Sequence, residues 1–410
     1  MIKKYAKVDE QGRILLPPDI IKKFGLHPGC ELAFEEGRDR LLINSPVSRL
    51  ARIYVEPTSH CNLECKTCIR NAWDEPMGNM SPGTYGKILK ALEKSDPIPE
   101  IFFGGFGEPL THPRILDMIG DAKKRGAHVE LISNGILLNS TMSESIVDLG
   151  IDRIWISIDG ASSDSYEDIR LGNELQGIKK NIQYLKELRR RSPKNTPAIG
   201  ITFVAMKRNI NELPDIYSLM NELGGDRLHI SNILPHTEDM KNEILYENAV
   251  NNWGTGATEI LFPRMDVNDI SWPGLKGLLS RFELHDLIEH EFSKPRDTCP
   301  FVEKGSISVR YDGKISPCLP LLHSGISYLK NIVRDNRATF FGSLNDSELL
   351  EIWNNNEYKE FRKKVMEFDF SPCTACSNCE MSETNEEDCY GSVPVSCGGC
   401  LWAQGFIQCP

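Results

Sequence analysis

The 410-residue sequence contains no apolar run that approaches the roughly 18 residues needed to cross a bilayer. Its first residues, MIKKYAKVDEQGR, also lack the apolar segment that a secretion signal requires. Neither absence favours a membrane-bound or exported protein. We therefore expect the chain to act in the cytoplasm, without a membrane partner.

Positive charge is scarce as well. Lys and Arg number 47 against 58 Asp and Glu, and the formal net charge is −11 at pH 7. This balance argues against broad binding to nucleic acids or anionic membranes, while leaving room for a local basic patch. The hydrophobic and charged fractions, 40% and 26%, are ordinary for a globular chain long enough for two or three domains.

The thirteen cysteines depart from this ordinary composition. Disulfide frameworks are expected in small secreted chains, whereas clustered thiols in a reducing compartment are better interpreted as metal ligands. Cys30 lies alone, a first group spans Cys61 to Cys68, and a second group spans Cys299 to Cys409. This distribution predicts more than one metal site.

Residues 50–235 alternate short apolar runs with segments of helical period. The runs are 53–55, 101–103, 129–132, 154–158, 199–204 and 228–233. Six β–α repeats of this kind predict an α/β fold, an open parallel (β/α)6 barrel or partial TIM barrel. In such barrels the chemistry gathers at the C-terminal ends of the strands.

Cys61, Cys65 and Cys68 directly follow the first of these strands with the spacing CxxxCxxC. Three thiolates on one loop can hold three irons of a four-iron cubane and leave the fourth without a protein ligand. A structural zinc site is the alternative, but it usually needs four protein ligands and no fourth is adjacent. The motif in this position resembles the radical S-adenosylmethionine (SAM) superfamily. The resemblance implies that these three are the catalytic cysteines, holding a [4Fe-4S] cluster bound to SAM.

The end of the second strand supplies a further match to that superfamily. The segment 104–109, GGFGEP, is similar to its GGE motif. The resemblance implies that Gly105 and Gly107 let the backbone approach the methionine moiety of SAM, and that Glu108 accepts a hydrogen bond from its ammonium group. Thr67 departs from the family, in which the residue before the third cysteine is commonly aromatic.

Later strand ends continue the series in the order that the superfamily has. Ser133 and Asn134 resemble the turn that contacts the SAM ribose, and Ser157 and Asp159 resemble polar groups near the ribose or carboxylate. Arg170 is in a position to pair with the SAM carboxylate. Each match alone is weak, because Gly-rich and Asn-Gly turns are common, so their order along about 180 residues is the stronger signal.

The second cysteine group opens with Cys299, Gly313 and Cys318 in the spacing CX9–15GX4C, which resembles the SPASM/twitch extension of radical SAM proteins. That resemblance implies two auxiliary [4Fe-4S] clusters in residues 299–410, after a linker or lid region at 236–298. Two clusters need eight thiolates, nine are present, and the later spacing CX2CX2CX9C departs from the usual one. Zinc ribbons are the alternative. The candidate ligands are Cys299, Cys318, Cys373, Cys376, Cys379, Cys389, Cys397, Cys400 and Cys409.

Residues 1–46 predict a small β-rich module. A turn at 9–13, a strand at 14–16, a helix from Pro18 to Phe24 and two strands ending at Ile43 resemble the AbrB/MazE-type swapped-hairpin family. Such modules are dimers that usually bind DNA. Here eight basic residues face seven acidic ones, so we expect a homodimer and rank DNA binding below it.

Substrate identity depends on resemblance alone. SPASM-bearing enzymes mostly modify peptides, proteins or cofactor precursors, and the motifs together look most like maturases of tungsten-cofactor (aldehyde ferredoxin) oxidoreductases. The resemblance also implies a low-potential electron donor such as ferredoxin or flavodoxin. A ribosomal-peptide maturase that forms a cross-link is one alternative. A redox-sensing DNA-binding regulator with iron–sulfur clusters is another, although a sensor needs no SAM pocket.

Overall fold

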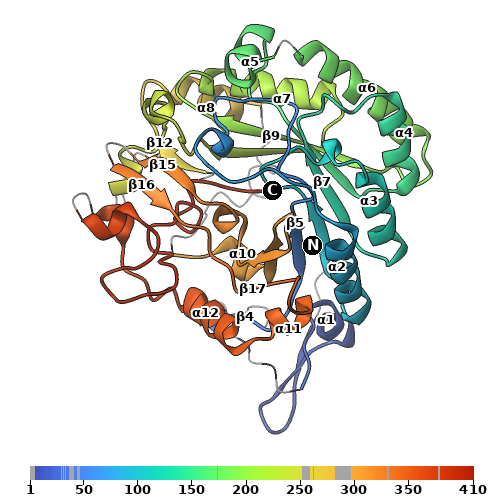
Figure 1. Cartoon of the computed structure of the whole chain (residues 1–410), viewed down its shortest axis with the longest axis vertical. Coiled ribbons are helices and arrows are strands. Elements are labelled where there is room, and N and C mark those ends of the chain that lie inside the picture. The colour runs from blue at the N-terminus through green and yellow to red at the C-terminus, as the bar shows by residue number, and fades with distance from the viewer. Residues whose placement is uncertain are drawn as a thin grey trace.

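A computed structural model describes residues 5–28, 30, 32, 34–36, 41–43, 47–172, 174–251, 259–261, 263–281, 297–329, 332–376 and 379–410. Its centre is a sheet of nine strands in the order β10-β9-β8-β7-β6-β5-β13-β14-β17. Figure 1 shows helices lying along the outer side of this sheet. The C-terminal elements, coloured orange and red, lie toward the lower left of the view. None of the helices in the described residues is long and apolar enough to cross a membrane.

The first six strands of the sheet are parallel and follow each other in chain order, which confirms the predicted (β/α)6 arrangement. They are β5 (Arg52–Val55), β6 (Glu100–Phe103), β7 (Val129–Ser133), β8 (Arg153–Ser157), β9 (Ala198–Ala205) and β10 (Arg227–Asn232). Their central residues, including Ile53, Phe103 and Ile156, are fully buried. Continuous apolar runs of this kind suit parallel strands, which are covered on both faces.

Amphipathic helices connect these strands and bury their apolar faces against the sheet. In α6 (Leu175–Arg191), for example, Leu175, Ile178, Ile182 and Leu185 are buried at helical spacing. A left-handed Gly150 ends α4, because glycine adopts that conformation without strain. The helices are α2 (Pro82–Lys94), α3 (Ile115–Lys124), α4 (Ser140–Leu149), α5 (Ser163–Arg170), α6 and α7 (Leu213–Glu222).

The C-terminal part extends the same sheet, which the sequence pattern did not predict. Strand β13 (Ser306–Val309) pairs in parallel with β5, and β14 (Lys314–Ser316) and β17 (Gly342–Ser343) continue in antiparallel pairing. A hairpin of β15 (Gly325–Leu329) and β16 (Ile332–Asn336) follows β14 in sequence. The short α10 (Pro300–Glu303), α11 (Leu349–Trp353) and α12 (Asn356–Glu367) complete this part.

The described residues between the barrel and the C-terminal part are packed rather than open. Strands β11 (Glu259–Leu261) and β12 (Arg264–Asp266) form a hairpin, and α8 (Trp272–Leu279) follows. Arg264 is 1% exposed and donates to the carbonyl oxygen of Gln404, near the C-terminus. Residues 252–258, 262 and 282–296 of the expected linker lie outside the described residues.

The N-terminal segment contains the strand, the helix and the two later strands that the sequence predicts, together with one short strand before the turn that it does not predict. They are β1 (Lys7–Val8), β2 (Ile14–Leu15), α1 (Pro18–Lys23), β3 (Phe34–Glu36) and β4 (Leu41–Ile43), with β1–β2 and β3–β4 as separate antiparallel pairs. Apolar side chains on β2 and β3 remain open to solvent: Ile14 is 49% exposed, Leu15 52% and Phe34 55%. These two strands therefore leave apolar surface exposed in one copy of the chain.

An ion pair between side chains of β5 and β7 makes the free energy of unfolding depend on pH. Glu130, near the start of β7, lies 2.6 Å from the guanidinium of Arg52 and accepts a hydrogen bond from Trp155. Burial opposes ionisation of Glu130, but hydrogen bonds from His128 and Trp155 and the charge of Arg52 outweigh it. Together they lower the pKa from 4.5 to about 2.

A depressed carboxyl pKa contributes stability above pH 4.5 that is lost as the pH falls toward 2. We predict that Glu130→Gln lowers the free energy of unfolding by about 3 kcal/mol at neutral pH. This difference from the wild type should narrow below pH 4.5. Urea unfolding of both proteins at several pH values measures it. A difference in the free energy of unfolding that stays constant below pH 4.5 would contradict this role of Glu130.

Candidate active site

The first cysteine group lies on a loop between β5 and a short 3-10 helix at Ile69–Asn71. The loop is held by hydrogen bonds to its own backbone: the amide of Asn71 donates to the carbonyl oxygen of Cys65 at 2.9 Å, and Arg70 donates to that of Leu63. The N–H of Leu63 points at the sulfur of Cys61 at 3.4 Å. These contacts fix the loop before any ligand is bound.

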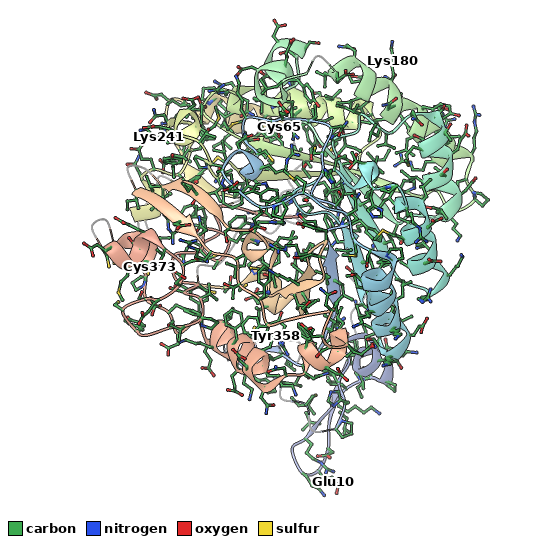
Figure 2. The ribbon with its side chains drawn as sticks, in the orientation of Figure 1. Glu10, Cys65, Lys180, Lys241, Tyr358 and Cys373 are labelled. Atoms are coloured by element: carbon green, nitrogen blue, oxygen red, sulfur yellow. The ribbon has the colours of Figure 1, made fainter. Side chains whose placement is uncertain are left out.

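The three cysteines open onto one cavity of about 310 Å³ at the C-terminal ends of the strands. Figure 2 shows Cys65 in this region, far from Cys373. The cavity walls include most residues that the sequence singled out. They are Cys61, Cys65, Cys68, Gly105, Gly107, Glu108, Ser133, Asn134, Ser157 and Arg170.

Glu108 connects two of the strand-end loops. Its carboxylate accepts from the backbone N–H groups of Leu110 at 3.0 Å and Asn134 at 2.7 Å. Burial raises its pKa, while the hydrogen bonds from Asn134 and Leu110 oppose the rise. Gly107 lets this loop approach the cysteine loop, because a Cβ there would come within 2.1 Å of the carbonyl oxygen of Thr58.

Arg170 and Asp159 form a buried pair at the edge of the cavity. Their side chains are 2.5 Å apart, and the Arg170 guanidinium also donates to the Cys65 sulfur at 3.7 Å. Asp159 is held in turn by the N–H of Val204. Asp159 therefore lies behind Arg170 and orients its guanidinium toward the cysteine loop.

Sequence reasoning missed a second guanidinium at the same loop. Arg70 lines the cavity, and the adjacent thiols of Cys68, Cys61 and Cys65 raise its pKa against the opposing effect of burial. The Nε groups of Arg70 and Arg170 are both buried, and neither has a hydrogen-bond partner among the residues that the structure describes. Two such donors beside three thiols suit an anionic group. Only the closeness of Arg70 to Cys68 in sequence could have indicated it.

A buried network also missed from the sequence joins the barrel to the C-terminal part. His323 is fully buried, and its ring nitrogens lie 2.9 Å from Glu56 and 2.9 Å from Glu75. Glu56 follows β5 directly and accepts from the N–H of Phe106 in the glycine-rich loop. Glu75 pairs with Arg310 at 2.6 Å. These contacts tie the end of β5 and the glycine-rich loop to the C-terminal part.

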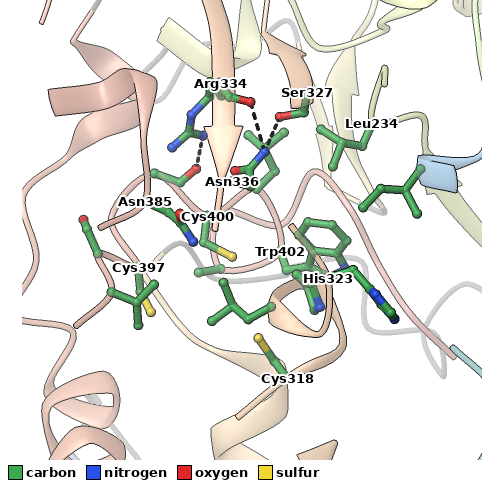
Figure 3. Close-up of a pocket in the computed structure, with 18 of the residues that line it drawn as sticks. Leu234, Cys318, His323, Ser327, Arg334, Asn336, Asn385, Cys397, Cys400 and Trp402 are labelled. Atoms are coloured by element: carbon green, nitrogen blue, oxygen red, sulfur yellow. Dashed lines mark hydrogen bonds between the residues drawn. The ribbon is translucent and has the colours of Figure 1, made fainter. Parts of the chain in front are cut away.

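A second cavity, of about 90 Å³, lies beside the first. Figure 3 shows Cys318, Cys397 and Cys400 in its wall with His323 and Trp402. Ile69, Phe106 and His236 line both cavities, so only side chains separate them. Four cysteines of the second group line this cavity: Cys299, Cys318, Cys397 and Cys400. Burial raises the pKa of the Cys318 thiol well above its usual value, and the other three raise it further.

The other cysteines of the second group separate into four and one. Burial raises the pKa of Cys376, and its neighbours Cys373, Cys379 and Cys389 raise it further. The buried carboxylate of Asp388 holds this region together by accepting from the N–H groups of Ser371 and Ser392.

Cys409 does not line the second cavity, although Cys400 contributes to raising its pKa, and it receives the indole N–H of Trp402 at 3.2 Å. All thirteen cysteines are free thiols. Among the described residues, no three His, Cys, Asp or Glu side chains are placed to hold a single metal ion.

Comparison with known families identifies the chain. The radical SAM superfamily model matches residues 55–220, and the SPASM iron–sulfur cluster-binding domain model matches residues 299–380. The tungsten-containing aldehyde ferredoxin oxidoreductase cofactor-modifying protein of Pyrococcus furiosus is 32% identical over 87% of this chain and 96% of its own length. The chain belongs to the radical SAM superfamily. It is an enzyme of the radical SAM/SPASM type.

Other relatives are more distant. The PqqA peptide cyclase of Gluconobacter oxydans is 23% identical over 85% of this chain and 86% of its own length. Among solved structures, anSMEcpe with bound AdoMet and Cp18Cys peptide superposes with a TM-score of 0.55 at 16% identity, covering 80% of this chain and 86% of that one. Streptococcus suis SuiB bound to precursor peptide SuiA gives 0.51 at 15% identity, covering 84% and 72%. These similarities support the partial-barrel fold.

The predicted cofactors are confirmed at the level of the family. A radical SAM domain binds a [4Fe-4S] cluster and SAM, and a SPASM domain binds additional iron–sulfur clusters. The residues present fit these groups, because three thiols and the side chains of Arg70 and Arg170, whose Nε donors have no partner among the described residues, line one cavity, and further thiols line the next.

We predict that the triple substitution Cys61→Ala, Cys65→Ala and Cys68→Ala abolishes SAM cleavage and removes about four irons per chain. The fold and the other irons should persist, because the second cysteine group lies in a different segment. Assays of 5′-deoxyadenosine and of iron on anaerobically purified protein measure both effects. Undiminished 5′-deoxyadenosine formation by the variant would contradict the site.

Proposed function

We propose that this enzyme matures a tungstopterin (aldehyde ferredoxin) oxidoreductase by modifying its cofactor or a precursor of it. The single observation that supports this most strongly is the similarity to the cofactor-modifying protein of Pyrococcus furiosus, which extends over nearly the whole of both chains. At 87% of this chain, the similarity extends well beyond the radical SAM segment at residues 55–220, so it reflects more than a shared SAM-cleaving core.

In this proposal Cys61, Cys65 and Cys68 hold the catalytic cluster. When bound, that cluster supplies the electron that cleaves SAM to methionine and a 5′-deoxyadenosyl radical. The cavity walls would hold SAM: Gly105 and Gly107 would let the backbone approach its methionine moiety, and Glu108 would fix the loop that receives the ammonium group. Ser133, Asn134 and Ser157 are within the same cavity and suit the ribose hydroxyls.

Arg170, held by Asp159, and Arg70 place positive charge beside the cysteine loop, where it stabilises thiolate and carboxylate groups. A low-potential donor such as ferredoxin or flavodoxin supplies the electron, and the enzyme acts in the cytoplasm. Free thiols throughout the chain suit a reducing compartment.

We further assign the auxiliary ligands from their proximity. Cys299, Cys318, Cys397 and Cys400 hold one cluster, next to the SAM cavity. Cys373, Cys376, Cys379 and Cys389 hold the other, nearer the surface, where Cys376 and Cys389 are exposed. Cys409 is the spare ninth thiol. The convergence of the first four on one cavity supports this division.

The cofactor itself tests the function. We expect the pterin cofactor extracted from the tungsten oxidoreductase of cells lacking this gene to differ in mass from that of wild-type cells. Wild-type enzyme supplied from a plasmid should restore the normal mass, and the triple Cys61, Cys65, Cys68 alanine variant should not. A cofactor of identical mass in all strains would contradict the proposal.

A peptide substrate is the second candidate, favoured by the similarity to PqqA peptide cyclase and by the fold shared with SuiB. The two candidates give different products. A peptide maturase changes the mass of a small precursor protein encoded nearby and leaves the pterin cofactor unchanged.

A regulator that senses redox state through its clusters is the remaining alternative. It has no use for the SAM-binding motifs at successive strand ends, and these count against it.

The auxiliary assignment predicts about twelve irons and little zinc in anaerobically purified protein. Cys389→Ser should remove about four of these irons, because a cubane with three protein thiolates is less firmly held. Cys409→Ser is the matched control and should remove none. Stoichiometric zinc with about four irons would favour the zinc-ribbon alternative.

We also propose that residues 1–46 form a dimerisation module. Ile14, Leu15 and Phe34 are half exposed in a single copy, and burial against a second copy would remove this apolar surface from water. The near balance of basic and acidic residues in the segment gives little attraction for DNA phosphates.

Deletion of residues 1–46 should therefore convert a dimer into a monomer in sedimentation while SAM cleavage persists. A truncated protein that remains dimeric would refute this. Nanomolar, sequence-selective DNA binding by the full chain at physiological salt would refute the ranking of dimerisation above DNA binding.

A further inference from the structure

Arg334 lies at the centre of the C-terminal part, on β16, and is only 7% exposed. Its Nη1 donates to the carbonyl oxygen of Gly399 at 2.6 Å, and its Nε donates to that of Ser382 at 3.0 Å. Gly399 stands between Cys397 and Cys400, and Ser382 follows Cys379 by three residues. One guanidinium therefore binds both cysteine-bearing loops. Figure 3 shows Arg334 in the wall of the second cavity.

The loop around Gly399 is shaped to admit this guanidinium. A Cβ at position 399 would meet Nη2 of Arg334 at 2.3 Å and its Cζ at 3.1 Å. Any other residue there would displace the side chain. The glycine of the Cys-Gly-Gly-Cys segment thus allows a cation to approach the backbone between two cysteines.

No carboxylate lies within ion-pair distance of Arg334 in the described part of the chain, and its hydrogen bonds go to carbonyl oxygens. Two other guanidinium groups near the active site do have such partners: Arg170 pairs with Asp159, and Arg310 with Glu75. A buried charge without a counter-ion is costly. The charged neighbours that favour the cation are Cys400 and Cys373, one from each four-cysteine set, and they oppose the lowering of its pKa by burial.

We propose that Arg334 is the shared counter-ion of the two auxiliary clusters and raises the reduction potential of both. The inference rests on the proposed function and on the division of the cysteines given there. A cluster gains negative charge on reduction, so a fixed cation nearby stabilises the reduced form relative to the oxidised form. Arg334 is a positioning residue: it acts on the clusters and on the two loops that hold them.

Redox titration of the intact chain, followed by electron paramagnetic resonance, tests this without reference to substrate. Arg334→Gln keeps amide donors for the two carbonyl oxygens but removes the charge. We expect it to retain the auxiliary irons and to shift the balance between oxidised and reduced auxiliary clusters toward the oxidised form by about tenfold or more at a fixed potential. Arg334→Lys, which keeps the charge, should keep the balance between oxidised and reduced clusters close to that of the wild type. Arg337→Gln, which removes a 55%-exposed cation near the end of the same hairpin, is the matched control and should shift nothing.

Unchanged potentials in an iron-replete Arg334→Gln protein would overturn the inference. If that variant loses auxiliary iron, Arg334→Lys decides: wild-type potentials support the role of the charge, and clearly lowered potentials refute it. The iron content of the wild-type protein separates a failure of this inference from a failure of the proposal on which it rests. Wild-type protein without auxiliary irons would refute the cluster assignment itself, whereas irons present with unmoved potentials would refute only the role of Arg334.

Discussion

The parallel pairing of β13 with β5 is the constraint on which the arrangement of the site depends. It places Ser306–Val309 beside Arg52–Val55, so the strand before Gly313 and Cys318 runs next to the strand before Cys61. The cysteine-rich part is thereby built onto the open edge of the barrel. The buried Glu56–His323–Glu75 network joins the two parts at the level where β5 ends. Glu56 and Glu75 belong to the barrel part of the chain and His323 to the C-terminal part, so the network forms only when both parts are folded.

This arrangement explains why two cavities with different linings share Ile69, Phe106 and His236 as walls. The first cavity has the polar strand-end groups that suit SAM, and the second has four thiols. Buried guanidinium groups accompany every cysteine group: Arg70 and Arg170 at the first, and Arg334 between the two sets of the second. A chain with an overall charge of −11 thus concentrates positive charge where thiolate ligands are expected.

The sequence predicted the barrel well because its signals are local. Six apolar runs, each followed by a turn with polar or glycine residues, determine the strands and the face on which the loops meet, and the order of the strands follows from βαβ connections. Glu108, Ser133 and Arg170 were singled out by resemblance to the superfamily, and they line one cavity with the cysteine loop.

Long-range pairings escaped prediction: β13 joins β5 from about 250 residues away, and nothing in either strand specifies the other. The division of nine similar cysteines, the pairing of Arg170 with Asp159, and the position of His323 likewise depend on tertiary contacts. Residues 1–46 are the converse case, because most of their local elements were foreseen while Ile14, Leu15 and Phe34 remain half exposed in the described structure.

The central claim is that the cysteine loop at the mouth of this barrel cleaves SAM. The most direct measurement is the incubation of anaerobically purified, cluster-loaded protein with SAM and a strong reductant, followed by quantification of the products. The account predicts 5′-deoxyadenosine and methionine in equal amounts, with neither formed when the reductant is omitted. SAM recovered intact from fully loaded, reduced protein would contradict it.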